Sequence, residues 1–346
     1  MRRGRRKSGG EEAEVDMTPT DVPMINVALS GSVDGGLAPG LTVLAGPSKH
    51  FKTSFALLMA ASYLKKHPEA VMLFYDSEFG TPPEYFKSFG IDMDRVIHTP
   101  ITDVEQLKFD ITNQLNDLDK KDNVCIVIDS IGNLASKKEV DDALDGKSVA
   151  DMSRAKQMKS LFRIVTPHLN LKDIPLICVN HTYKEIGLFP KDIVSGGTGA
   201  YYSADAIWII GRRQEKEGTE MKGYHFVVNI EKSRHVREKS QIPITVTFDG
   251  GIMKWSGLLE VAEKAGYVHK PKVGWYEAVN PATGEVISEK LMRAKEVNDN
   301  GDFWNMMFET TDFKDYVRKT FTIGASGSIM REDDDSVFEE EEVIEG

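Results

Sequence analysis

A lysine followed by a threonine, Lys52-Thr53, closes a loop that begins at Gly46, where an apolar run ends. This is the spacing of the phosphate-binding motif G-x-x-x-x-G-K-[ST], in which backbone N–H groups and a helix N-terminus surround a phosphate. In such a loop the lysine reaches the terminal phosphates of a nucleotide, and the threonine hydroxyl helps to hold Mg²⁺, which prefers oxygen ligands. We expect these residues to contact the nucleotide: Gly46, Pro47, Ser48, Lys49, His50, Phe51, Lys52 and Thr53.

Phe51 stands where that motif has its second glycine, which weakens the match. An ordinary turn between a strand and a helix, with a solvent-exposed lysine, would fit the same pattern. Two further apolar runs favour a nucleotide site, because each ends in carboxylates: Asp76 and Glu78 after the first, and Asp129 after the second. Ligands of open parallel sheets bind at the carboxyl ends of the strands. We therefore expect these acids and the loop to face one nucleotide.

Apolar runs with the length of strands recur along the chain between segments with helical spacing. The helical segments include residues 80–89, 104–118 and 152–165. Strands that alternate with helices predict an α/β fold with a mostly parallel central sheet. The strand-like runs lie near residues 71–75, 95–97, 124–128, 174–179, 206–210, 225–231 and 242–248.

The chain has 346 residues, of which 40% are hydrophobic and 28% charged, as is ordinary for a globular protein. No apolar run is long enough to span a bilayer, and the charged N-terminal residues do not resemble a signal peptide. We therefore expect a cytoplasmic protein with no membrane partner. The two cysteines, Cys125 and Cys178, lie in predicted strands outside any C-x-x-C pair, which argues against a disulfide framework or a zinc site.

Composition divides the chain into four parts. Residues 1–22 are polar and begin with a basic cluster, so we expect a disordered arm. The nucleotide-binding core is expected over 23–254, a small α/β domain over 255–325, and a disordered acidic tail over 326–346. The net charge is −11, of which residues 331–346 contribute −8, leaving −3 for the rest.

With these motifs in view, the chain resembles the RecA-family recombinases, and most closely the UvsX group of tailed phages, over residues 23–321. The resemblance implies a RecA-like P-loop ATPase core and a small C-terminal α/β domain. UvsX-type members also carry phenylalanine before the lysine, and Phe51 must then point away from the phosphates and pack on the helix side. The matching segments are GPSKHFKT (46–53), FYDSEFG (74–80), IDSIGNLASKKE (128–139), VNHT (179–182), SGGTG (195–199) and EKSR (231–234).

The resemblance also implies roles for the polar residues at the strand ends. Glu78 matches the carboxylate that polarises the attacking water, with Asp76 as its rival because it also ends the strand. Asp129 matches the residue that holds Mg²⁺ through coordinated water. His181 matches the position that senses the γ-phosphate, although a histidine after a strand is more often a structural hydrogen-bond donor.

Two irregular segments, 136–150 and 182–199, match the two DNA-binding loops of the family. Lys147 and Arg154 are candidates for contacts with DNA phosphates, and glycines would let backbone N–H groups approach the strand closely. Binding of single strands without sequence preference depends on such backbone contacts. The candidates in the second loop are Gly196, Gly197, Thr198 and Gly199.

Lys232 and Arg234 match a pair of cations that reach into the nucleotide site of the neighbouring subunit. Composition alone would instead place them on a solvated strand edge. The resemblance therefore implies that each active site is completed only when subunits assemble.

We therefore expect an ATP-dependent and Mg²⁺-dependent recombinase that forms helical filaments on single-stranded DNA and exchanges strands with a homologous duplex. Its other expected partners are further copies of itself, a single-strand-binding protein and a recombination mediator. Two alternatives remain open: a hexameric helicase with the same ATPase fold, and a DNA-coating or mediator protein without hydrolysis. Glu78 and Asp129 argue against the last of these.

Overall fold

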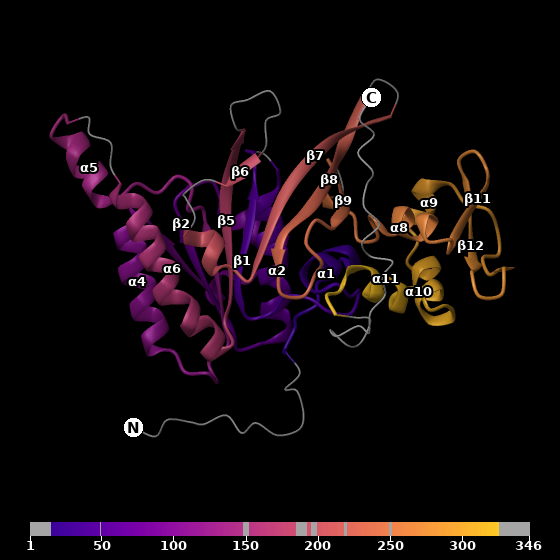
Figure 1. The fold of residues 1–346 in the computed structure, drawn as a ribbon, viewed down its shortest axis with the longest axis horizontal. Helices are drawn as coiled ribbons and strands as arrows, with labels where there is room; N and C mark the ends of the chain where they lie inside the picture. The colour runs from indigo at the N-terminus through magenta and orange to yellow at the C-terminus, as the bar shows by residue number, and fades with distance from the viewer. Residues whose placement is uncertain are drawn as a thin grey trace, which may run out of the picture.

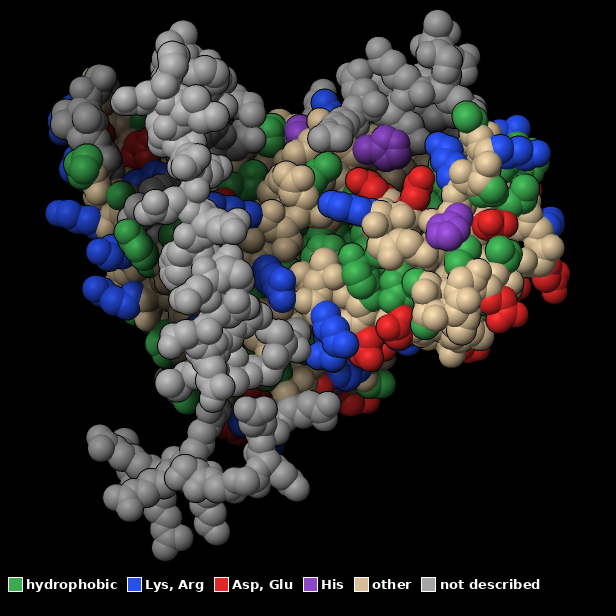
Figure 2. Space-filling view, turned by 45° about the vertical axis from the view of Figure 1, so that its right-hand side comes forward, with side chains coloured by type: hydrophobic (Ala, Val, Ile, Leu, Met, Phe, Trp, Pro, Cys, Tyr) green, Lys and Arg blue, Asp and Glu red, His purple; other side chains and the backbone are tan. Residues whose placement is uncertain are grey.

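A computed structural model describes residues 15–48, 50–147, 152–184, 192–194, 199–217, 220–248 and 251–324 (Figure 1). None of the described helices is long and apolar enough to cross a lipid bilayer. Figure 2 shows basic and acidic side chains interspersed over the right half of one face, in keeping with the nearly balanced charge outside the acidic tail.

The main sheet has the strand order β10-β9-β8-β7-β1-β5-β4-β2-β3, with β6 paired to β5. The strands from β7 to β3 in this order pair in parallel, and β8, β9 and β10 extend the sheet by antiparallel pairing. The prediction of a mostly parallel central sheet is confirmed. The bounds are β1 (Gly40–Gly46), β2 (Val71–Asp76), β3 (Val96–Pro100), β4 (Val124–Asp129), β5 (Pro175–Lys184), β6 (Asp192–Val194), β7 (Ala206–Glu217), β8 (Glu220–Ser233), β9 (Gln241–Thr247) and β10 (Gly251–Ile252).

Helices cover both faces of this sheet, so its central strands are buried on both sides. On β1, Leu44 faces the core that includes α1 and α2, whereas Val43 and Ala45 face the core formed with α4 and α6. Because β1 ends at Gly46, the phosphate loop that follows it lies at the carboxyl end of the parallel strands. The bounds are α1 (Pro23–Ser30), α2 (Lys52–Lys66), α3 (Pro83–Ser88), η1 (Met93–Arg95), α4 (Val104–Asp117), α5 (Lys137–Leu144), α6 (Ser153–Lys172) and α7 (Gly199–Ser203).

The C-terminal part forms a small α/β unit beside β9 (Figure 1), as predicted. Its interior holds Trp304, which is fully buried and donates its indole N–H to the carbonyl of Val297 at 2.9 Å. A tight turn after Asn280 joins two antiparallel strands. The bounds are α8 (Leu258–Lys264), β11 (Val268–Lys272), β12 (Trp275–Asn280), β13 (Glu285–Val286), α9 (Ala294–Asn298), α10 (Gly301–Thr310) and α11 (Phe313–Phe321).

The structure differs from two expectations based on composition. The residues before α1 include buried ones, since Thr18 pairs with Leu37 and Val22 is 3% exposed, so the expected disordered arm does not extend to residue 22. The first segment expected to be irregular, 136–150, contains α5, whose first turn is closed by a capping box between Ser136 and Glu139. The second, 182–199, contains the end of β5 and the strand β6, which pairs with it.

Candidate functional site

Parallel pairing brings the predicted site residues to one edge of the sheet. Asp129 at the end of β4 pairs with Asp76 of β2 and with Val179 of β5, and Gly46 at the end of β1 pairs with His181. A pocket of about 340 Å³ opens at this edge, which is within the range of small-molecule sites. Its lining includes Ser48, His50, Lys52, Glu78, Tyr85 and His181.

Lys52 is buried at the start of α2, and its ammonium is held by the phosphate loop itself. Nζ donates to the carbonyl oxygens of Gly46 at 2.9 Å and Pro47 at 2.7 Å. Burial lowers the pKa of Lys52 to about 8, although the negative charges of Asp129 and Glu78 act in the opposite direction. A poorly solvated cation at this position gains strongly from an anionic ligand.

Phe51 has a left-handed backbone, with φ of 54°, which explains why glycine usually occupies this position. Its ring packs against Phe226 and Tyr224 of β8, with centroid distances of 5.5 and 6.0 Å. Phe226 also contacts Phe55 of α2, so Phe51 lies on the face of the sheet that α2 covers, in keeping with the expected packing on the helix side. Lys49 lies outside the described residues.

Thr53 and Asp129 supply the oxygen atoms that a hard cation requires. Thr53 Oγ1 donates to Asp129 Oδ2 at 2.8 Å, and Asp129 is 4% exposed. Burial raises the pKa of Asp129 to about 6, helped by Glu78 and Asp76, whereas the hydrogen bond from Thr53 lowers it. A bound cation would favour the ionised form, so this hydroxyl and carboxylate fit Mg²⁺ beside nucleotide phosphates.

Asp129→Asn is expected to stabilise the free protein at neutral and higher pH. A carboxyl whose pKa is raised on folding favours the folded state below its ordinary value of 3.8, and this contribution is lost as the pH rises through about 6. The amide removes that penalty and can still accept from Thr53. We expect the free energy of unfolding at pH 8 to rise by up to about 3 kcal/mol, with no difference below about pH 4.

Urea unfolding at pH 4 and pH 8, without nucleotide or Mg²⁺, measures this difference. Asp117→Asn, at an exposed position in the last turn of α4, serves as the control and should change stability at neither pH. An Asp129→Asn protein that is less stable than the wild type at pH 8 would contradict the expected burial penalty.

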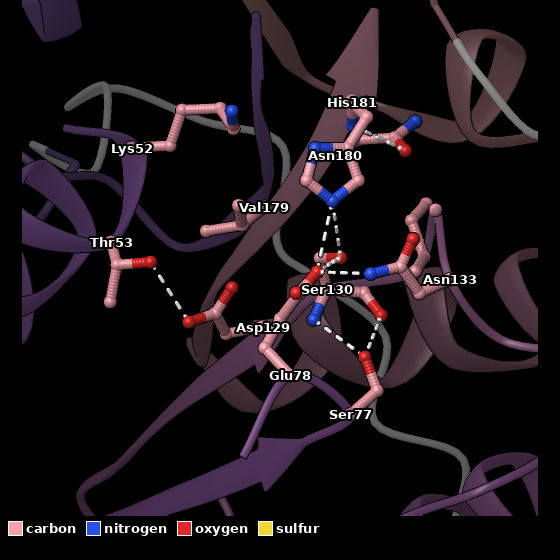
Figure 3. A network of polar contacts seen from close by, with 12 residues as sticks. Lys52, Thr53, Ser77, Glu78, Asp129, Ser130, Asn133, Val179, Asn180 and His181 are labelled. Atoms are coloured by element: carbon pink, nitrogen blue, oxygen red, sulfur yellow. Dashed lines mark hydrogen bonds and ion pairs between the residues drawn. The ribbon is translucent and has the colours of Figure 1, made fainter. Parts of the chain in front are cut away.

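Glu78 lies just beyond β2, and one of its carboxylate oxygens accepts three hydrogen bonds (Figure 3). Oε1 accepts from Ser130 Oγ at 2.6 Å, Asn133 Nδ2 at 2.8 Å and His181 Nε2 at 2.9 Å. Burial acts to raise the pKa of Glu78, but the hydrogen bonds from Ser130 and His181 and the charges of His181 and Lys52 together hold it below its usual value. Among the described residues none donates to Oε2, and Glu78 lines the pocket.

Asp76, the rival acid, has a different role. Its buried carboxylate accepts from the backbone N–H groups of Glu78 at 3.0 Å and Phe79 at 2.8 Å, and bonds to His98 Nε2 at 2.8 Å. Asp76 thus fixes the turn that carries Glu78. This arrangement favours Glu78 over Asp76 as the group that faces the pocket.

The candidate DNA contacts have different environments. Lys147 is exposed and pairs with Asp145 at 3.0 Å. Arg154 differs from the expectation, because its guanidinium donates to backbone carbonyls of residues 131, 132 and 134.

Gly199 is buried at the start of α7, where a Cβ would lie 2.9 Å from Lys159 Cα, so close helix packing explains this glycine. Gly196, Gly197 and Thr198 lie outside the described residues.

Lys232 and Arg234, the expected intersubunit cations, make contacts within their own chain. Lys232 Nζ donates to the carbonyls of Tyr201 at 2.9 Å and Tyr202 at 3.3 Å, at the end of α7. Arg234 forms an ion pair with Asp205, yet its side chain remains 69% exposed. Lys232 lies near the end of β8, and Arg234 directly follows this strand.

Ser130, Asn133 and Tyr85 are site residues that sequence reasoning did not identify. Ser130 and Asn133 lie within the segment that matches the family after Asp129, but only the folded turn brings them to Glu78. Tyr85 of α3 hydrogen-bonds to Ser54 of α2, which places its ring at the pocket. No sequence spacing links α3 to the phosphate loop.

Two family models match this chain. The RecA N-terminal domain model matches residues 4–253, and the model of the C-terminal domain of the bacteriophage T4 recombination and repair protein matches residues 255–317. The chain is 52% identical over 318 residues to the recombination and repair protein of Enterobacteria phage T4, covering 91% of this chain and 81% of that protein.

More distant relatives are bacterial. The chain is 27% identical over 275 residues to Protein RecA of Tropheryma whipplei, covering 78% of this chain and 60% of that protein. It is 27% identical over 266 residues to Protein RecA of Streptomyces avermitilis, covering 76% of this chain and 68% of that protein. The chain therefore belongs to the RecA family, in the group that contains the recombination and repair protein of phage T4.

Proposed function

We propose that this protein is a DNA-dependent ATPase that uses ATP and Mg²⁺ to drive homologous DNA strand exchange. One observation carries the proposal: Glu78 lines the same pocket as Lys52 and the Thr53–Asp129 pair. These are the groups that phosphoryl transfer needs, namely a positioned base, a phosphate-binding cation and oxygen ligands for a metal.

Each residue has a defined task in this proposal. The loop amides and Lys52 bind the phosphates of ATP. Tyr85 offers its ring for stacking on the adenine base. Thr53 and Asp129 would hold Mg²⁺, which neutralises charge on the phosphate oxygens when bound. Glu78 is ionised at neutral pH because its pKa lies below the usual value, so it can orient and polarise a water molecule through Oε2.

His181 connects the reaction to the rest of the chain. Its ring contacts Glu78 and it lies on β5, which leads directly into the segment that matches the second DNA-binding loop. We infer that His181 senses the γ-phosphate and that ATP thereby controls DNA binding. The protein would act as a helical filament on single-stranded DNA in the host cytoplasm, with a single-strand-binding protein and a mediator as partners.

A strand-exchange assay tests this function. With ATP and Mg²⁺, a labelled single strand should displace its identical strand from a homologous duplex, but not from a heterologous one of equal length and composition. A helicase would unwind a tailed duplex without a homologous strand. A coating protein would bind the single strand without DNA-stimulated hydrolysis, so either result would overturn the proposal.

Lys232 and Arg234 are further proposed to stabilise charge on a phosphoryl group held by the neighbouring subunit. A Glu78→Gln subunit would still offer these cations, and a Lys232→Ala/Arg234→Ala subunit would still offer Glu78. Mixing the two inactive proteins should therefore restore DNA-stimulated hydrolysis. Random assembly makes about one interface in four complete, so recovery near a quarter is the expected ceiling.

Co-assembly must first be verified by energy transfer between labelled variants. The control is a mixture in which both proteins carry Glu78→Gln, which should stay inactive. If co-assembled filaments hydrolyse ATP no faster than either variant alone, the two cations serve only their contacts with α7 and Asp205.

A further inference from the structure

Arg154 lies in the first turn of α6 and clamps the turn that follows β4. Its Nε donates to the carbonyl of Leu134 at 2.6 Å, and Nη2 donates to the carbonyls of Ile131 at 3.0 Å and Gly132 at 3.2 Å. A planar guanidinium is suited to such a set of acceptors, whereas an ammonium is a point charge on a flexible stem. This side chain therefore links the position of α6 to the shape of the turn.

The same turn contacts the groups proposed to act on ATP. Asn133, at its centre, donates to Glu78 Oε1 at 2.8 Å (Figure 3). Gly132 packs on His181 so closely that a Cβ would lie 2.7 Å from the ring atom Cδ2. A shift of this turn would therefore move a donor away from Glu78 and also change the space available to His181.

The far end of the turn is fixed by a different element. Ala135 pairs with Asp103, and its carbonyl accepts the N–H of Val104 at 2.9 Å at the start of α4. Leu134 is 2% exposed and anchors the turn in the core. Leu134 also shares this core with Met158 and Leu161 of α6, and Arg154 adds the hydrogen bonds that tie the first turn of α6 to the backbone of the turn.

We propose that Arg154 and Asn133 are positioning residues that couple the first turn of α6 to the carboxylate of Glu78. The inference rests on the proposed ATPase function. The segment that matches the first DNA-binding loop ends immediately before α6, so DNA that shifts α6 would alter the orientation of Glu78. Arg154 thus acts on hydrolysis through Asn133 rather than by binding a DNA phosphate.

Arg154→Lys separates these two roles because it keeps the charge and removes the fork of donors. We expect the single-strand DNA-stimulated kcat to fall by about 10-fold, while the Kd for DNA and the KM for ATP stay within about 2-fold. Arg163→Lys, at an exposed position on the same helix, should match the wild type. An unchanged kcat, or a weakened DNA affinity that accounts for the whole loss, would overturn the proposal.

Asn133→Ala should show the same loss of kcat with unchanged affinities, and Asn113→Ala, exposed on α4, is its control. The double variant Asn133→Ala/Arg154→Lys should be no slower than the slower single variant, because both changes interrupt one route. Losses that multiply would show two independent roles and contradict the coupling.

Asn133→Asp gives a readout that a general loss of stability would not produce. The new carboxylate would lie beside Glu78, whose other charged neighbours are Lys52, His181 and Asp129. A second negative charge nearby raises the pKa of Glu78, because like charges disfavour ionisation. The acidic limb of the pH–rate profile should therefore move to higher pH, and an unmoved limb would overturn the role of Asn133. If the wild-type protein showed no DNA-stimulated hydrolysis, the proposed function itself would be overturned. If the wild type hydrolysed ATP and the Arg154→Lys and Asn133→Ala variants were equally active, only this inference would be overturned.

Discussion

Glu78→Gln is expected to slow DNA-stimulated ATP hydrolysis by about 10²- to 10⁴-fold, the range that general base catalysis contributes. The amide keeps the size of the side chain and can still accept from Ser130, but it cannot take up charge from an attacking water molecule. Binding of ATP and of single-stranded DNA should remain within about 2-fold of the wild type, since Glu78 acts only on the chemical step.

Phosphate release at saturating ATP and DNA measures the rate, and a fluorescent ATP analogue measures binding. Glu84→Gln, at an exposed position on α3, is the matched control and should hydrolyse ATP normally. Hydrolysis that survives Glu78→Gln but is lost in a stably folded Asp76→Asn protein would show that the wrong carboxylate was assigned. The structure argues against that outcome, because Asp76 is engaged with His98 and the backbone of the turn.

Lys52→Ala is expected to weaken ATP binding by at least about 10- to 100-fold and to abolish filament assembly that depends on ATP. The change removes a charge-assisted hydrogen-bond donor to the phosphates, worth about 1.5–3 kcal/mol even before its Coulomb energy is counted. It also leaves the carbonyls of Gly46 and Pro47 without their present donor. The loop would then lose both its cation and part of its internal support.

Equilibrium binding of the ATP analogue to Lys52→Ala provides the measurement. Lys65→Ala removes an exposed lysine in the last turn of the same helix and should bind as the wild type does. Thermal unfolding of both variants without nucleotide separates a loss of binding from a loss of fold. ATP affinity equal to that of the wild type would contradict the assignment of the phosphate loop.

Much of the fold follows from patterns that are local in sequence. The apolar runs that end at Gly46, Asp76 and Asp129 are strands because buried parallel strands need continuous apolar sequence, and their polar ends must then meet at one edge. The predictions for Lys52, Thr53 and Glu78 depended on that geometry, and the structure places all three around one pocket.

Other features could not be inferred because they depend on contacts between distant segments. Arg154 has the charge of a DNA ligand, but its partners lie 20 to 23 residues earlier in the chain. Phe51 packs on aromatic rings of β8, more than 170 residues later. By contrast, the capping box of α5 was present in the sequence, where Ser136 precedes Glu139 by three residues, and it predicts the helix that the structure contains.

Electron cryomicroscopy of the protein with single-stranded DNA, Mg²⁺ and a slowly hydrolysed ATP analogue tests the central claim most directly. The account predicts a helical filament with one nucleotide at each interface. Lys52 and Glu78 of one subunit and Lys232 and Arg234 of the next should lie on opposite sides of the γ-phosphate. A closed ring, irregular coating of the DNA, or a nucleotide contacted by a single subunit would contradict it.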